Sequence, residues 1–450
     1  MTPSPRHPAA KRPDDLMTVL PRKLGLVDAT AIVIGDVVGT AIFLVPNSVA
    51  QNLSSAAMIL AVWIVTGVLS FFGALAYAEL GAMIPSTGGQ YVFLRDSYGP
   101  LWGFLCGWSF ILAIYSGANA TLAVGFATYL SFFVHLTPLL FKLAAVGLVA
   151  VLTFVNYRGV ELGAATQRFF TLLSVSGLVA IIGSALLSRQ STAIEWSLPA
   201  SIPWSRFGVA MIACLWAYEG WSSVSFVAGE IKQPQRNLPL SLGLGVAIIV
   251  ALYVLANVAY LKILPISTIA STERVAATMA ERTIGPLGAS LVALTVLLST
   301  AGCTNAGTMT GPRIYFAQAR DGLFFRKIGD VHPRFQTPSI SILVQGIVTA
   351  VLAVSGSYEK LFSYVTFVAW VFYGLTVTGV LVLRRKYPDL PRPYKMWGYP
   401  VTPVLFAAIA FGFVINTLVT TPGPSLKGIA IVASGVPVYY VWKRKARALL

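Results

Sequence analysis

The chain has 450 residues, of which 56% are hydrophobic and only 11% charged, and its mean hydropathy is +0.76. About a quarter of the residues of a typical soluble domain are charged, so this composition excludes a soluble globular protein. It indicates a polytopic membrane protein. The formal net charge of +16 is spread along the chain rather than gathered in one basic segment. We therefore attribute it to membrane topology and expect the lipid bilayer, not nucleic acid, as a partner.

The chain begins with a polar segment and continues as a series of apolar runs. Residues 1–22 are basic and rich in proline, without the apolar stretch of a signal peptide, so we expect a cytosolic tail. The runs that follow approach or exceed the roughly 20 residues that cross a bilayer. We predict twelve transmembrane helices, near residues 25–50, 56–83, 99–131, 139–157, 163–187, 207–229, 239–262, 286–312, 338–354, 361–383, 400–419 and 426–442.

The basic residues orient these helices. Most of the 32 Lys and Arg residues lie in the tail, in the connections after every second run and at the C-terminus. Cytosolic loops carry this excess, so both termini are expected in the cytosol. The prediction is an integral protein of the plasma (inner) membrane.

Cysteine and histidine give no sign of catalysis. Cys106, Cys214 and Cys303 lie in three different apolar runs, without the spacing of a metal site, and we interpret them as packing residues. The three histidines are dispersed, and no nucleophile, base and orienting group converge. We expect neither an enzyme nor a metal site.

The first apolar run contains polar and flexible residues at the depth where a membrane helix should be continuous. Asp36 lies three residues before Gly39 in this run. An ionised side chain at the centre of an inserted helix costs about 2.5 to 3.5 kcal/mol, so Asp36 indicates a function or a polar partner. We predict an interruption of the helix here.

The sixth run carries a second interruption of the same kind. Glu219 and Gly220 lie in its middle. Each half of the chain then contains five helices, and because five is odd the halves cross the membrane in opposite orientations. Paired interruptions in inverted halves are the sequence signature of a secondary transporter with a binding site at the membrane midplane. The structural alternative is that both glycines are close-packing contacts.

Interrupted helices expose backbone groups that lipid cannot satisfy. N–H groups are free at the start of one half-helix and C=O groups at the end of the other. A zwitterion suits both, because its carboxylate is attracted to the helix N-terminus after Gly39 and its ammonium to the carbonyl ends. Amino acids are the zwitterions we expect.

Several motifs resemble those of the amino acid-polyamine-organocation (APC) superfamily. Residues 35–46 resemble its unwound Gly-Ser-Gly-Ile-Phe signature, with Thr40 and Ala41 at the Ser and second Gly. Residues 216–221 and the loop at 230–239 resemble the sixth helix and following loop of the L-type amino acid transporter branch. Further matching segments are residues 72–91, 98–108, 313–322 and 392–400, so the resemblance covers roughly residues 22–445.

The resemblance implies an all-α polytopic membrane fold. This is the five-plus-five inverted repeat, or LeuT fold, with 12 transmembrane helices, of which helices 1 and 6 are interrupted and the last two are additions. The implied organisation is a cytosolic tail at 1–22, a first repeat of helices 1–5 at 23–190, a second repeat of helices 6–10 at 203–386, and helices 11–12 with a basic cytosolic C-terminus at 387–450. The implied function is secondary active transport of amino acids by alternating access.

The resemblance also implies a substrate site at the two breaks. The N–H groups around Thr40, Ala41 and Ile42 would bind the substrate carboxylate, and the carbonyls of Val37, Trp216 and Glu219 would bind its ammonium. Trp216 stands where the family has an aromatic gate, and packing is the alternative interpretation of this residue. The substrate-binding residues predicted in this way are Val37, Gly39, Thr40, Ala41, Ile42, Trp216, Ala217, Glu219 and Gly220.

The coupling ion stays open between H⁺ and Na⁺, and no other cofactor is expected. Ser174 stands where the L-type branch carries a lysine, in a region that holds an ion in sodium-coupled relatives. Asp36 could be a protonatable or cation-attracting group, or it could hydrogen-bond to a neighbouring helix. Ser299, Thr300 and Asn305 in the eighth helix are further candidates, although hydroxyls in membrane helices often bond to their own i−4 carbonyl.

Glu219 bears on the substrate class. Many relatives have glycine at its place, and members that accept cationic substrates often have an acid. A buried carboxylate would favour a Lys- or Arg-like side chain, whereas a protonated one would suit a neutral amino acid. A polyamine or organocation permease is the alternative function, suggested by two midplane acids, and a membrane-embedded sensor or enzyme would need a domain or catalytic set that the sequence does not display.

The remaining expectations concern partners and gating. The outer loop at 131–138 lacks the cysteine by which animal members bond to a heavy-chain glycoprotein, so no disulfide-linked heavy chain is expected and the chain resembles a prokaryotic-type carrier. Glu79 near the cytosolic end of helix 2, and Glu230 with Arg236 after helix 6, are interpreted as inner-gate or loop-packing ion pairs.

Overall fold

The computed structural model describes residues 20–448, except 193, 195, 197–200 and 356–357, so most of the predicted tail at 1–22 lies outside the described residues. The described chain is helical, with no strand longer than an isolated bridge between Leu24 and Ile231. Its helices are α2 (Leu26–Val37), α3 (Ala41–Asn52), α4 (Ala56–Met83), α5 (Gln90–Tyr98), α6 (Pro100–Ser109), η1 (Phe110–Ile114), α7 (Tyr115–Leu130), α8 (Pro138–Arg158), α9 (Val160–Leu187), α10 (Trp204–Ala217), η2 (Trp221–Glu230), α11 (Pro234–Ile263), α12 (Ile266–Ser271), α13 (Val275–Ile284), α14 (Pro286–Thr310), α15 (Pro312–Arg320), η3 (Arg326–Gly329), α16 (Ser339–Ser355), α17 (Tyr358–Lys386), α18 (Val401–Thr420) and α19 (Pro422–Ala448).

Each of the twelve predicted apolar runs coincides with helical structure. Within the described residues nine helices are long and apolar enough to cross a membrane, or ten when the bent pair α2 and α3 is one crossing. The other two predicted crossings correspond to α10 followed by η2 and to α16, which has 17 residues. The count of twelve crossings therefore stays a prediction, while the polytopic all-α class is confirmed.

The first predicted break is present between α2 and α3, which are bent by 45° relative to each other. Val38 ends α2 with ψ 78, outside the helical region, and α3 restarts at Ala41. Farther along α3, Pro46 has no N–H to donate to Ile42 one turn earlier. The hydroxyl of Tyr260 donates to that Ile42 carbonyl instead, at 3.4 Å.

The second predicted break is present between α10 and η2. The α-helix α10 ends at Ala217, and Gly220, which precedes η2, takes φ +119°, a left-handed conformation that L side chains rarely adopt. The chain continues as the 3₁₀-helix η2 rather than as an α-helix. Both interruptions that the sequence predicts are therefore found at the predicted residues.

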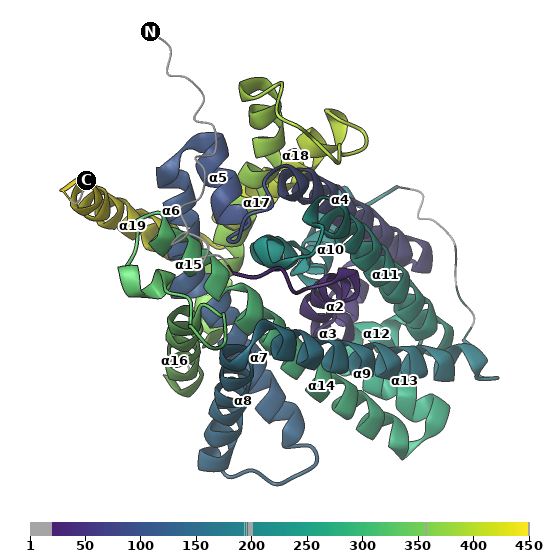
Figure 1. Cartoon of the computed structure of the whole chain (residues 1–450). Coiled ribbons are helices and arrows are strands. Elements are labelled where there is room, and N and C mark those ends of the chain that lie inside the picture. The colour runs from purple at the N-terminus through teal and green to yellow at the C-terminus, as the bar shows by residue number, and fades with distance from the viewer. Residues whose placement is uncertain (1–19, 193, 195, 197–200, 356–357, 449–450) are drawn as a thin grey trace.

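The broken helices lie in the middle of the bundle. In Figure 1, α2, α3 and α10 are surrounded by α4, α11, α9, α7 and α17, whereas α18 and α19 lie at the periphery. A break in the helix is tolerable at membrane depth only where protein or a cavity, not lipid, faces it. The central position satisfies that requirement.

One face of the bundle is tied together by backbone bonds and ion pairs. The Lys23 and Leu24 N–H groups donate to the Glu230 carbonyl at 2.8 and 2.9 Å, so the chain before α2 lies against the end of η2. Lys23 also pairs with Glu161 at 3.1 Å, and Arg168 pairs with Asp28. The distribution of basic residues predicts that this face is cytosolic.

Candidate functional site

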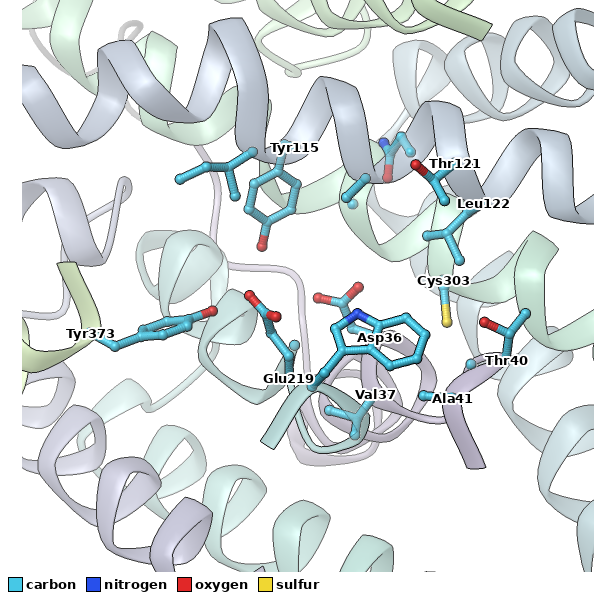
Figure 2. A pocket seen from close by; sticks show the side chains of 17 residues that line it. Asp36, Val37, Thr40, Ala41, Tyr115, Thr121, Leu122, Glu219, Cys303 and Tyr373 are labelled. Carbon is cyan, nitrogen blue, oxygen red and sulfur yellow. The ribbon is translucent and has the colours of Figure 1, made fainter. Parts of the chain in front are cut away.

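A cavity of about 150 Å³ lies where the two breaks meet. The two backbones approach closely there, since a Cβ on Gly220 would lie 2.8 Å from the Asp36 carbonyl oxygen. The cavity is walled by α2, α3, η1, α7, α10, α14, α17 and both breaks (Figure 2). Its lining residues are Asp36, Val37, Gly39, Thr40, Ala41, Ile114, Tyr115, Ala118, Asn119, Thr121, Leu122, Trp216, Glu219, Gly220, Cys303, Gly307 and Tyr373.

The start of α3 supplies backbone donors at this cavity. Thr40 is its N-cap residue and Ala41 its first helical residue, so the first N–H groups have no carbonyl one turn earlier in the helix. Within the described part of the chain, the N–H groups of Thr40, Ala41 and Ile42 donate to no other backbone carbonyl. The N-terminus of α3 is therefore a candidate site for an anionic group.

The carbonyls at the ends of α2 and α10 are largely occupied in this conformation. The Val37 carbonyl accepts from the Gly39 N–H at 2.8 Å and from the Tyr253 hydroxyl at 2.9 Å. The Trp216 carbonyl accepts from the N–H groups of Tyr218 and Glu219. Since a carbonyl oxygen has two lone pairs, neither group has a free one to offer an ammonium without a rearrangement.

Two carboxylates face the cavity together. Figure 2 shows Asp36 and Glu219 directed into the same space, with the hydroxyls of Tyr115 and Tyr373 turned toward them. No Lys, Arg or His is among the described residues that line the cavity. The cavity lining therefore carries a net negative charge whenever either carboxylate is ionised.

Some of the predicted site residues lie outside the cavity lining. Ile42 and Ala217 are buried beside it, with 0% and 1% exposure. Ser174 donates to the carbonyls of Phe170 and Thr171 in its own helix, and Thr300 donates to that of Leu297. The roles assigned to these residues stay predictions.

Two residues of α14, the predicted eighth helix, form hydrogen bonds to neighbouring segments. Ser299 donates to the Val38 carbonyl at the first break. Asn305 donates to the Gly163 carbonyl at 3.1 Å and to the Gln167 side chain at 2.8 Å, and accepts from Asn156 at 2.8 Å. Asn305 therefore joins α14 to α8 and α9 through buried amide groups and does not line the cavity.

Sequence reasoning found Trp216 but missed two tyrosines and a thiol of the cavity. Tyr115 and Tyr373 come from α7 and α17, and Cys303, interpreted as a packing residue, lines the cavity from α14. The structure, but not the sequence, marks Tyr115 as a candidate, because this residue directly follows the π-helical turn η1. Such turns are frequent at functional sites. Nothing in the spacing of these residues distinguishes them from other aromatic residues in the chain.

The inner ion pairs differ in part from the predicted ones. Glu230 pairs with Arg313 through two hydrogen bonds, of 2.8 and 3.0 Å, and not with Arg236, so the predicted partner was wrong. The reason is burial, since Glu230 and Arg313 are enclosed between η2 and α15 whereas the Arg236 side chain is exposed. Glu79 of α4 accepts two hydrogen bonds from Arg384 of α17, at 2.8 and 2.6 Å, so this ion pair joins the two helices.

Comparison with known proteins decides the family. The sequence profile of the amino acid permease family matches residues 24–441, nearly the whole chain. The chain belongs to the amino acid permease family. Membership in this APC-superfamily group makes the protein a transporter and not an enzyme.

The permease is also similar to known transporters over nearly its whole length. It is 31% identical over 438 residues to the human b(0,+)-type amino acid transporter 1, covering 94% of this chain and 88% of the relative. It is 34% identical over 446 residues to the human large neutral amino acids transporter small subunit 2, with 95% and 82% covered. It is 33% identical over 442 residues to the human cystine/glutamate transporter, with 95% and 87% covered. The substrates in these names differ, so similarity does not fix the substrate of this permease.

Proposed function

We propose that this permease binds an amino acid between its two helix breaks and carries it across the plasma (inner) membrane by alternating access. The observation that supports this most directly is that the free N–H groups of α3 and the two carboxylates lie on one central cavity. The α3 N-terminus suits a substrate carboxylate, and Asp36 and Glu219 suit an ammonium group. Thr40, Ala41 and Ile42 would then bind the head group through the backbone, whatever their side chains.

The ammonium has two groups of acceptors in this proposal. The carboxylates are available in the conformation described, whereas the carbonyls of Val37 and Trp216 already accept two hydrogen bonds each. Engaging those carbonyls requires the breaks to rearrange when substrate binds. Trp216, which lines the cavity, is the residue that we propose closes over the bound substrate.

The substrate class that the cavity favours is a cationic amino acid. Two acids face the ligand, and the described lining offers no basic residue to neutralise them. A neutral amino acid is the second candidate, favoured when protons occupy the carboxylates. A polyamine permease is not favoured, because a ligand without a carboxylate leaves the α3 N-terminus unused.

For coupling we propose Asp36, which reaches the cavity from the first break. It lies in the same space as the substrate, so its protonation can be linked to substrate binding through charge. Ser174 and Thr300 donate to carbonyls of their own helices, whereas Ser299 and Asn305 bond to neighbouring segments. In this conformation we do not assign the coupling ion to any of the four.

We propose that a set of contacts holds the predicted cytosolic face closed in this conformation. The bridge between Leu24 and Ile231 and the pairs Lys23–Glu161 and Arg168–Asp28 hold the chain before and within α2 against η2 and α9. In alternating access, release of substrate to the cytosol requires these contacts to separate. We propose that the carrier acts without a disulfide-linked heavy chain and with both termini in the cytosol.

The test is uptake into liposomes that contain only this protein. A panel of labelled cationic, neutral and acidic amino acids is presented with and without a proton gradient, a sodium gradient and internal substrate. We expect saturable uptake, with cationic amino acids preferred and stimulation by one of the gradients or by internal substrate. No saturable uptake of any member of the panel under all these conditions would contradict the proposal.

A further inference from the structure

A second cavity lies on the outside of the bundle, away from the substrate site. It has a volume of about 410 Å³ and runs between α8 and α16, which we call the α8–α16 groove. Its lining residues are Val146, Val149, Ala150, Thr153, Phe154, Tyr157, Leu343, Gly346, Ile347 and Ala350. Phe154 and Ile347 are 57% and 63% exposed, so the groove faces the surroundings of the bundle, which in a membrane is lipid.

Close helix packing forms the floor of this groove. A Cβ on Gly346 would lie 2.5 Å from the Thr153 hydroxyl, so the glycine allows α16 to approach α8 there. The larger side chains of Phe154, Leu343 and Ile347 stand on either side. From Val146 to Tyr157 the groove follows α8 for about 16 Å at 1.5 Å per residue, which is close to half of a hydrocarbon core roughly 30 Å thick.

Two arginines lie at one end of the groove. The Arg158 guanidinium is 5.4 Å from the centre of the Phe154 ring and 5.1 Å from that of Phe335. The Arg334 guanidinium is 5.6 Å from the same Phe335 ring. Both side chains are exposed, and both positive charges lie beside the same ring at the end of the groove.

The loop that carries Arg334 is held against α8 by specific contacts. Thr337 donates to the Tyr157 carbonyl at 2.9 Å, and the His332 ring nitrogen accepts from the N–H groups of Arg334 and Phe335 at 3.2 Å each. The Tyr157 ring, which lines the groove, meets the Phe335 ring edge-on at 5.7 Å. The basic end is therefore continuous with the apolar groove.

Neither arginine has an acidic partner within the residues that the structure describes. The nearby Glu161 pairs with Lys23, and the ion pairs of the described chain include none from Arg158 or Arg334. Two adjacent cations without a counter-charge are an attractive site for an anion at the membrane surface. The distribution of basic residues places this end of the groove on the cytosolic side.

We propose that the α8–α16 groove binds an anionic glycerophospholipid of the inner leaflet. One acyl chain lies along the apolar groove over the length of one leaflet, and the phosphate group binds Arg158 and Arg334. The site is separate from the amino acid cavity, so it would stand even if the substrate assignment failed. Its chemistry distinguishes it from general lipid contact, because the two arginines favour a headgroup of net negative charge over phosphatidylcholine, whose quaternary ammonium offsets the same phosphate.

The test is a lipid titration of the purified full chain, read by native mass spectrometry. Phosphatidylglycerol and phosphatidylcholine with the same acyl chains are compared on the wild type and on the double variant Arg158→Gln/Arg334→Gln. We expect phosphatidylglycerol to bind the wild type about thirtyfold more tightly than phosphatidylcholine, since each of the two arginines contributes about 1 kcal/mol of binding free energy. The double variant should bind the two lipids equally.

Two further variants separate the groove from surface charge. Arg320→Gln/Arg326→Gln removes two exposed charges from the same stretch of chain outside the groove and should leave the preference within about twofold of the wild type. Ala150→Phe fills the groove without changing charge and should weaken the binding of both lipids. Equal binding of the two lipids by the wild type, loss of the preference in the control pair, or unchanged binding by Ala150→Phe would each overturn the proposal, as would evidence that a second copy of the chain covers this face.

Discussion

Asp36 and Glu219 are the two residues whose chemistry dominates the central cavity. They reach it from different helix breaks, and Figure 2 shows their carboxylates in the same space. Two ionised groups so close repel each other, and a cation or a proton between them relieves the repulsion. Substrate choice and coupling can therefore be tested by neutralising each acid separately.

Replacing Glu219 with glutamine tests substrate choice. Glu219→Gln keeps the size of the side chain and removes its charge, so it should lower arginine uptake relative to leucine uptake by roughly tenfold or more, the value of a buried charge-assisted hydrogen bond. The measurement is competing uptake of the two amino acids in proteoliposomes. An unchanged ratio would exclude a contact between Glu219 and the substrate side chain.

Replacing Asp36 with asparagine tests coupling. If Asp36 must bind a proton before transport, wild-type uptake rises as the external pH falls through the titration of this carboxyl, and Asp36→Asn loses that dependence because an amide does not titrate. Uptake is measured at a series of external pH values with the internal pH fixed. A variant that retains the full pH dependence of the wild type rules out this role.

At the scale of the element, the geometry of the breaks depends on small residues at backbone contacts. Gly220 has a left-handed backbone and lies so close to the first break that a Cβ would be 2.8 Å from the Asp36 carbonyl oxygen. A side chain at this position would have to separate them. The same does not hold for a glycine that has open space around it.

Gly220→Ala should therefore lower uptake by about tenfold or more while the protein still folds, because a Cβ is disfavoured at φ +119 and would lie 2.8 Å from a backbone oxygen. Gly208→Ala in α10 is the matched control, since no atom lies within 4 Å of a Cβ there. Uptake and size-exclusion profiles are measured for both. Equal activity of the two variants would show that the break does not need the conformation of Gly220.

How much could be predicted from the sequence differs between the helices and the cavity. The apolar runs and both breaks are readable locally, since Asp36–Gly39 and Glu219–Gly220 conflict with a continuous membrane helix at their own positions. Tyr115, Cys303 and Tyr373 are not, because their place on the cavity depends on how α7, α14 and α17 pack around the breaks. The partner of Glu230 was mispredicted for the same reason, since Arg313 is distant in sequence and Arg236 is near.

At the scale of the whole molecule, transport requires the closed face to open. Ion pairs at that face are partly exposed, and such pairs contribute about 0.2 to 1 kcal/mol each. The pair Arg168–Asp28 joins α9 to α2, four residues along the chain from Leu24 of the bridge to Ile231. Loss of one ion pair should therefore shift the equilibrium toward the conformation that is open to the cytosol, while both conformations stay populated.

Arg168→Gln should raise the rate at which a thiol reagent on the cytosolic side modifies Cys303, by roughly two- to fivefold. Cys303 lines the cavity and serves as the reporter when Cys106 and Cys214 are replaced by alanine. Arg236→Gln is the matched control, because Arg236 is exposed and forms no ion pair within the described residues. An unchanged rate in Arg168→Gln would mean that this pair does not hold the face closed.

Competition for uptake shows whether the two breaks together bind the zwitterionic head group. Uptake of the preferred labelled amino acid into proteoliposomes is measured in the presence of the same amino acid unlabelled, its methyl ester, or the amine that lacks its carboxyl group. We predict that only the free amino acid competes strongly, because the N–H groups of Thr40, Ala41 and Ile42 need a carboxylate. Stronger competition by the amine than by the amino acid would contradict binding of the head group at the two breaks.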